Sequence, residues 1–146
     1  MKKRLFVILI ALINTYFVFA VNTSKQDKYD NILSQAAQEV DKIFGTKEDE
    51  YTVIIGADFL KGDSVNKFVY YYVVSSEIWS DLLEATDVLK EELRKNLKES
   101  VSKDEDFSLF IDMLIENGSE LCYNYECKNE YFAVEFSWED LRQLKS

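Results

Sequence analysis

Histidine is absent from this chain of 146 residues, and cysteine occurs only twice, as Cys122 and Cys127. A structural zinc site needs several cysteine or histidine ligands, and two thiols are too few to build one. A Ser-His-Asp hydrolase needs a histidine base, and a nucleophilic cysteine ordinarily needs one as well. The four residues between the cysteines also exclude the C-x-x-C spacing of redox proteins. We therefore expect no structural zinc centre, no catalytic triad and no thiol-redox chemistry.

Glycine is scarce, proline is absent, and basic residues are outnumbered by acidic ones. The glycines stand singly at Gly45, Gly56, Gly62 and Gly118, so no glycine-rich loop can cradle a phosphate. Acidic residues number 27 against 17 basic ones, which gives a net charge of −10. Nucleic acid and anionic lipid are bound through clustered lysine and arginine, and the sequence contains no basic stripe. We expect no nucleic-acid partner and no cofactor.

The apolar run near the N-terminus is too short for a typical membrane span. Residues 2–4 are basic and precede the apolar stretch 5–20, which Asn14 interrupts before it reaches the ~20 residues that a span needs. Small residues at positions 18 and 20 match the preference of a signal peptidase. We predict a signal peptide over 1–20 that is cleaved after Ala20. An uncleaved anchor is the alternative.

The remaining residues, 21–146, then form a single exported domain that is periplasmic or secreted, with no stable membrane insertion after cleavage. Loss of the three basic residues takes its net charge from −10 to −13, an acidity that favours solubility. The hydrophobic content of 47% and the aromatic content of 14% are too high for a disordered chain. We therefore expect one domain with a real core.

The pattern along this domain predicts a helix, two strands, two helices, two strands and a short helix. The signals are a capping box at Ser24 with Gly45 beyond the helix, β-rich runs at 51–58 and 67–75, helix starts at Thr86 and Ser102, two strands within 121–136, and a cap at Ser137. The strands come in adjacent pairs. A single α+β domain with an antiparallel sheet of about four strands fits this order best.

The strand register of the closing hairpin, LCYNYECKNEYFAVEF, determines whether the two cysteines can form a disulfide. A turn at 127–130 pairs residues 121, 123 and 125 with 136, 134 and 132, so that every inward pair is apolar. Cys122 and Cys127 then lie on one strand, on opposite faces and ~16 Å apart. A disulfide requires α-carbons within ~7 Å, so we predict two free thiols. A wide bend at Glu126 would instead allow a disulfide.

Two acidic clusters are candidates for a metal site, and no carboxylate pair stands out as catalytic. The clusters are Asp104-Glu105-Asp106 and Glu48-Asp49-Glu50. Neither fits the twelve-residue calcium loop, and the helix dipole explains acidic residues at a helix start. We therefore assign no metal ligands and no catalytic residues. Composition alone does not exclude a carboxylate pair for glycoside hydrolysis.

Residues 89–141 carry a resemblance. This segment resembles small exported bacterial proteins and lipoproteins of uncharacterised function. The features that carry the resemblance are an L-x3-L-x3-L helix, a second helix, Y-N-Y, a short polar turn and VEFSWEDL. The implied α+β fold is similar to that of small secretion pilotins. Unlike the lipoproteins, this chain has no lipidation cysteine after its apolar run. The resemblance implies export and assigns no functional residue.

The strand at 67–75 is apolar on both faces, which predicts a central strand that is at least partly covered on each side. One face carries Val69, Tyr71 and Val73, and the closing hairpin adds Tyr131. Either the first helix or the helix at Thr86 lies over this face, or the face stays accessible and binds a partner, since tyrosine suits protein interfaces.

The function that the sequence favours is that of a non-catalytic exported accessory or binding protein that contacts another envelope protein. The alternative is a carboxylate-based hydrolase that acts on an envelope polymer.

Overall fold

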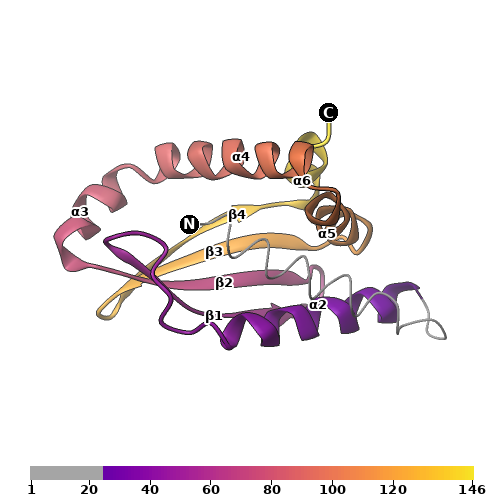
Figure 1. Cartoon of the computed structure of the whole chain (residues 1–146), viewed down its shortest axis with the longest axis horizontal. Helices are drawn as coiled ribbons and strands as arrows, with labels where there is room; N and C mark the ends of the chain where they lie inside the picture. The colour runs from indigo at the N-terminus through magenta and orange to yellow at the C-terminus, as the bar shows by residue number, and fades with distance from the viewer. Residues whose placement is uncertain (1–24) are drawn as a thin grey trace.

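The computed structural model describes residues 25–146 as five helices and one four-stranded sheet (Figure 1). The elements are α2 (Lys25–Asp41), β1 (Thr52–Leu60), β2 (Lys67–Val74), α3 (Ser76–Glu84), α4 (Thr86–Lys103), α5 (Glu105–Glu116), β3 (Glu120–Cys127), β4 (Glu130–Phe136) and α6 (Trp138–Gln143). The predicted α+β class and order are confirmed, with the short helix α3 as an addition. The predicted signal peptide and the capping box at Ser24 lie outside the described residues.

The sheet is mixed, where the sequence predicts an antiparallel one. Its strand order is β1-β2-β3-β4, and the two hairpins are antiparallel as expected, but β2 and β3 pair in parallel. The reason lies in the connection between the hairpins. Helix α4 has 18 residues and spans about 27 Å, roughly the length of a strand of eight residues. One pass of α4 returns the chain to the end where β2 began, so β3 runs in the same direction as β2 (Figure 1).

The register of the closing hairpin is confirmed. Leu121 pairs with Phe136, Tyr123 with Val134 and Tyr125 with Phe132. The turn at Lys128 and Asn129 joins the two strands, and Lys128 adopts a φ of 55°. Burial of the apolar pairs therefore selects the register even though a lysine occupies the left-handed region that glycine prefers.

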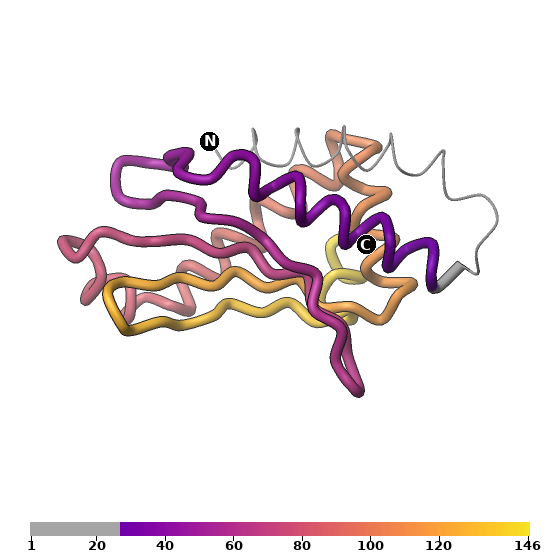
Figure 2. Tube along the Cα trace, turned by 90° about the horizontal axis from the view of Figure 1, so that it is seen from below, coloured from indigo at the N-terminus to yellow at the C-terminus, as the bar shows by residue number. Residues whose placement is uncertain are grey.

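Helix α2 is held against the edge strand β1 at a bulge. The pairing of β1 with β2 shifts between Ile54 and Gly56, and Gly56 has a φ of 150°. A side chain at this position would collide with the Asp41 carboxylate, which accepts a hydrogen bond of 3.1 Å from the Ala57 N–H. The glycine thus lets the end of α2 approach the strand. Figure 2 shows α2 running beside the β1 edge of the sheet.

The core lies on one face of the sheet, between the strands and the helices. Stacked tyrosines dominate this inner face: the ring centroids of Tyr70 and Tyr123 are 5.5 Å apart, and those of Tyr72 and Tyr125 are 5.2 Å apart. The helices contribute buried residues to the same cluster, including Leu33, Ala36, Leu93, Leu97, Phe107, Phe110 and Leu141. Each strand therefore places alternate residues in one apolar layer.

The helix N-termini test the capping residues that the sequence pattern predicts. Ser137 and Asp140 form the predicted capping box of α6. The predicted box at Ser102 is wrong, because the Asp104 side chain caps α5 by accepting hydrogen bonds from the N–H groups of Asp106 and Phe107. In residues 25–146, no helix combines the length and the apolar character needed to span a bilayer.

Candidate functional site on the open face of the sheet

The four residues proposed for partner binding share the face of the sheet opposite the core. Val69, Tyr71 and Val73 alternate with the core residues of β2, and Tyr131 lies on the same face of β4. Tyr131 is 75% exposed and Val73 is 36% exposed, while Tyr71 is half-buried and Val69 is buried. The structure therefore brings the predicted residues onto one surface, which we call the open face.

The expectation that a helix covers this face is wrong for the helices that the structure describes. Both α2 and α4 contribute their buried residues to the core cluster, which contains the inner residues of β2 but neither Val69 nor Cys122. The central position of β2 is confirmed by the strand order. The second face of β2 carries the buried Val69 but also the half-buried Tyr71 and the exposed Val73, so it is covered only in part.

A shallow hollow of about 280 Å³ lies on the open face. Val69, Tyr71 and Tyr131 line it together with Leu60, Cys122 and Ala133, so all four strands contribute. Polar and charged side chains, among them Lys67, Asn124, Glu126 and Glu135, complete its wall. The combination of aromatic, aliphatic and acidic groups in an open depression suits contact with a protein surface better than enclosure of a small molecule.

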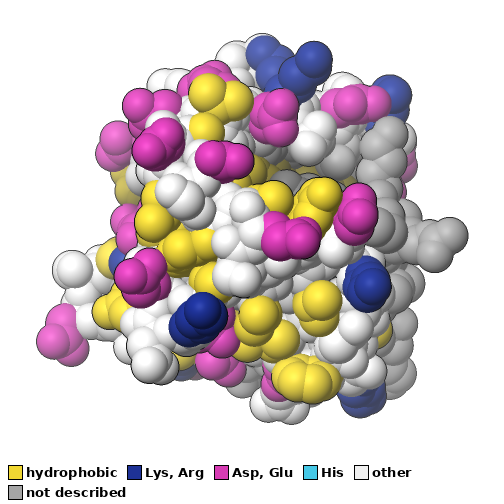
Figure 3. Space-filling model, turned by 90° about the vertical axis from the view of Figure 1, so that its left-hand side faces the viewer, with side chains coloured by type: hydrophobic (Ala, Val, Ile, Leu, Met, Phe, Trp, Pro, Cys, Tyr) yellow, Lys and Arg dark blue, Asp and Glu magenta, His cyan; other side chains and the backbone are white. Residues whose placement is uncertain are grey.

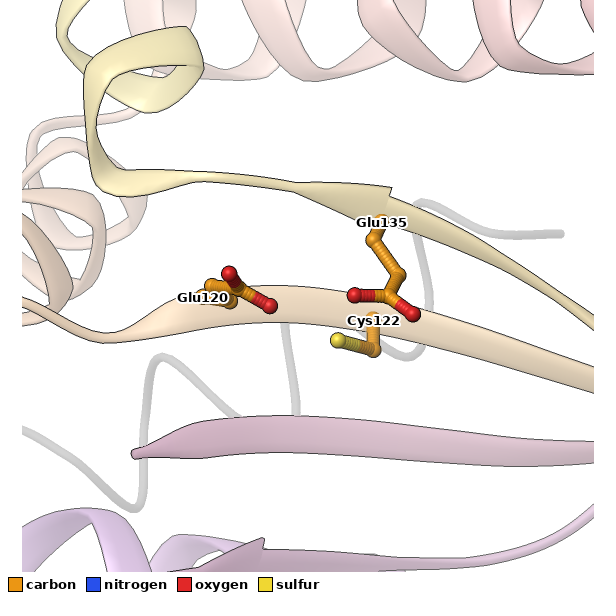
Figure 4. Close-up of side chains that lie close together, drawn as sticks. All are labelled: Glu120, Cys122 and Glu135. Carbon is orange, nitrogen blue, oxygen red and sulfur yellow. The ribbon is translucent and has the colours of Figure 1, made fainter. Parts of the chain in front are cut away.

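Glu120, Cys122 and Glu135 form a cluster at one end of the hollow (Figure 4). Cys122 pairs directly with Glu135 across β3 and β4, and Glu120 lies two residues before Cys122 on the same face. One oxygen of each carboxylate and the sulfur lie within 4.8 Å of one another. The Lys67 ammonium is 3.2 Å from Glu135 Oε2 and 3.6 Å from Glu120 Oε2, because the parallel pairing places Lys67 beside Glu120.

The environment of this cluster shifts several pKa values. Burial, followed by the neighbouring Glu135 carboxyl, raises the pKa of Glu120. The hydrogen bond to Glu135 raises the pKa of Lys67. Burial, and then the negative charge of Glu135, raises the pKa of the Cys122 thiol to about 12. Because the thiolate is the reactive form, a raised pKa makes Cys122 a poor nucleophile at neutral pH.

Both cysteines are free, as predicted. They lie on opposite faces of β3, with Cys127 in the core cluster and Cys122 in the hollow of the open face. The regular strand between them keeps the thiols apart, and the wide bend at Glu126 that would permit a disulfide does not occur.

The acidic clusters considered from the sequence have local structural roles. Asp104 caps α5, and Asp49 Oδ1 accepts a hydrogen bond of 2.8 Å from the Tyr51 N–H. The group with metal-ligating geometry in the described chain is instead Glu120, Cys122 and Glu135, which sequence reasoning missed. The hairpin register contained the signal, because pairing Leu121 with Phe136 also places Cys122 opposite Glu135.

The comparisons with known proteins concern the fold. No protein-family model matches the chain, and no curated protein matches its sequence. Among solved structures, a candidate secreted protein from Pseudomonas aeruginosa has a similar fold, with a TM-score of 0.61 and 14% sequence identity. The match covers 84% of this chain and 100% of that chain. These comparisons do not support the likeness to pilotins, and the chain shares with this neighbour a small α+β fold.

Proposed function

We propose that this protein is an exported, non-catalytic accessory protein that binds another envelope or secreted protein through its open face. The observation that carries the proposal is that an apolar and aromatic strip, Val69, Tyr71, Val73 and Tyr131, lies on the face of the sheet that the described helices leave uncovered. Tyrosine is enriched at protein interfaces because it offers a large apolar ring and a polar tip.

Export rests on the N-terminal sequence. The basic start, the apolar run and the small residues before Val21 follow the order of a signal peptide. The structural neighbour is itself a candidate secreted protein, which supports the same location for this fold. An intact mass that begins at Val21 would verify the cleavage, and a full-length species that needs detergent for extraction would argue for an anchor.

The charge of the open face indicates the kind of partner. Glu126 lies directly opposite Tyr131, and Asp58 and Glu135 flank the row that contains Val69. Lys67 is the basic residue in the lining of the hollow. The end of the molecule that carries α3 likewise shows acidic side chains around apolar ones (Figure 3). A partner surface with basic residues around an aromatic or aliphatic centre would be complementary, and its association would weaken with salt.

The hydrolase alternative has one carboxylate pair to draw on, Glu120 and Glu135. Glycosidase carboxyls stand about 5–9.5 Å apart, with the scissile bond between them. Here the carboxylate oxygens lie within 4.8 Å of each other and the Lys67 ammonium contacts both. Because the Lys67 ammonium already pairs with both acids, the arrangement favours binding over hydrolysis.

Site-specific photo-cross-linking tests the proposal in cells that export the protein. A photoreactive phenylalanine analogue in place of Tyr131 should cross-link to a defined envelope or secreted protein. The same analogue at Val88, which is 61% exposed on α4, is the matched control. Equal cross-linking from both positions, or a product that contains only two copies of this chain, would contradict the proposal.

Substitutions then separate binding from folding. Tyr71→Asp should abolish the Tyr131 cross-link and leave the circular dichroism spectrum unchanged, because Tyr71 lies outside the core cluster. Glu126→Lys should weaken the cross-link by removing charge complementarity. If Tyr71→Asp unfolds the protein, Tyr71 belongs to the structural core and the docking proposal is wrong.

A further inference from the structure

Three metal-ligating side chains meet on the open face as a consequence of strand register. Cys122 and Glu135 are direct cross-strand partners, and Glu120 shares a face with Cys122 two residues earlier on β3. Neighbours of this kind are held by the backbone ladder. Two rigid strands therefore present one sulfur and two carboxylates to a common point, with all three ligand groups within 4.8 Å of one another.

The cluster also contains buried polar atoms that make no hydrogen bond. The Cys122 side chain is only 3% exposed, and its thiol has no hydrogen-bond partner among the described residues. Figure 4 shows its sulfur close to both carboxylates. The enclosed Glu120 Oε2 atom makes no hydrogen bond and has only a long ion pair of 3.6 Å with the Lys67 ammonium. Buried polar atoms are usually satisfied, so these atoms point to a ligand that would satisfy them.

We propose that Glu120, Cys122 and Glu135 bind a divalent transition-metal ion of the zinc class. One thiolate and two carboxylates suit a borderline ion such as Zn²⁺, whereas calcium and magnesium prefer oxygen ligands alone. Three protein ligands leave the fourth tetrahedral position to water. As the metal–sulfur bond forms, the thiol proton leaves to solvent. The site shares Cys122 and Glu135 with the hollow of the open face, but binding of the ion does not require a protein partner.

Binding of the ion requires a small rearrangement of the two glutamate side chains. Bond lengths of about 2.0–2.3 Å place the ligand atoms of a tetrahedral zinc ion roughly 3.5 Å apart. The two glutamate side chains would therefore draw closer to the sulfur by about 1 Å through rotation of their terminal bonds, which are soft. The backbone pairing that fixes their Cα positions need not change.

Lys67 is the competitor for this position. Its ammonium forms ion pairs with both carboxylates, at 3.2 Å and 3.6 Å, and its side chain is partly exposed to solvent. A divalent ion carries twice the charge and can reach the sulfur as well, so it should displace the ammonium toward solvent. Removal of the lysine charge should then strengthen metal binding.

Titration of the purified, reduced protein with Co²⁺ tests the site. Coordination of a thiolate to Co²⁺ produces a near-ultraviolet charge-transfer band, which should saturate at one ion per chain and disappear when Zn²⁺ is added. Cys122→Ser should remove the band, and Glu135→Gln should weaken Co²⁺ binding at least roughly tenfold. Cys127→Ser, on the opposite face of the same strand, and Asp58→Asn, an acidic residue on the same face, are matched controls that should leave the titration unchanged.

Each outcome decides the proposal. Absence of the band in the wild-type protein, or its loss in Cys127→Ser with retention in Cys122→Ser, would overturn it. Lys67→Met should tighten Co²⁺ binding several-fold, and an unchanged or weaker affinity would show that the ion does not enter between the carboxylates. Circular dichroism of every variant establishes that it is folded, and a Glu120→Gln variant provides a second ligand deletion if Cys122→Ser does not fold.

Discussion

The two faces of the sheet are built from alternate residues of the same strands, yet they differ in what they contain. The inner face stacks Tyr70, Tyr72, Tyr123 and Tyr125 beneath the helices. The open face sets tyrosine and valine beside carboxylates, an amide and a thiol around a shallow hollow. Aromatic residues occur on both faces, so the difference lies in their neighbours rather than in residue type. The inner rings contact one another, whereas the outer rings border charge.

The two cysteines show the same contrast on a single strand. Cys127 is buried with apolar residues of the core cluster and behaves as a small hydrophobic residue. Cys122 is buried as deeply but lies against two carboxylates and an ammonium group. Burial alone therefore does not separate a structural position from a chemical one. The polar atoms around the buried group make that distinction.

The ionisation of tyrosines at alkaline pH should give the largest difference between the inner face and the open face. Burial raises the pKa values of Tyr70, Tyr72, Tyr123 and Tyr125 above the usual 10.0. Above pH 10 the unfolded chain releases these protons while the folded chain retains them, so the free energy of unfolding falls as pH rises. For each such tyrosine, the free energy of unfolding falls by roughly 1.4 kcal/mol per pH unit. The inner tyrosines should therefore ionise only as the protein unfolds.

Phenolate absorbance and far-ultraviolet circular dichroism, recorded together from pH 9 to 13, measure this coupling. On the open face, burial followed by the Asp58 charge raises the pKa of the half-buried Tyr71, which should still ionise while the sheet is intact. Complete ionisation of all tyrosines with an unchanged dichroism spectrum would mean that the inner face is open to water.

Truncation of one tyrosine on each face should give the next largest contrast. Tyr123 is fully buried, stacks on Tyr70 at 5.5 Å and meets Phe136 edge-on at 6.2 Å. Tyr123→Ala should lower the free energy of unfolding by about 3–5 kcal/mol, because it removes a large ring and leaves a cavity. Tyr131→Ala on the open face should change it by no more than about 0.5 kcal/mol. Urea unfolding at pH 7 compares them, and similar losses would show that Tyr131 is also part of the packed structure.

Features fixed by local pattern could be predicted from the sequence. The register that joins Leu121 to Phe136 follows from apolar alternation, and the capping box of α6 follows from Ser137 and Asp140. The strip of Val69, Tyr71 and Val73 follows from a strand that is apolar on both faces. In each case the deciding information lies within one hairpin or one helical turn.

Features that depend on how distant segments meet could not be predicted in this way. The parallel pairing of β2 with β3 depends on the path of α4, and it alone brings Lys67 to Glu120. Helix α3 has nine residues with Trp79 as its buried residue, and that indole is positioned by a hydrogen bond of 2.7 Å to Glu130, 51 residues away in the sequence. The hairpin register predicts that Cys122 lies opposite Glu135. It does not predict that Lys67 lies beside these residues and competes with a metal ion for the carboxylates.

Removal of single tyrosine hydroxyl groups should give the smallest and most specific difference in stability between the two faces. The Tyr125 hydroxyl is buried and has no hydrogen-bond partner within the described chain, while its ring stacks on Tyr72 at 5.2 Å and on Phe132 at 5.3 Å. Tyr125→Phe keeps both stacks and removes the unsatisfied group, so it should raise the free energy of unfolding by about 1 kcal/mol. Tyr71→Phe on the open face should give no gain, because that hydroxyl interacts with Asp58. Urea midpoints at pH 7, with an unchanged slope, measure both effects. If Tyr125→Phe instead lowers stability, its hydroxyl has a partner, and the inner face is less purely apolar than the stacked rings indicate.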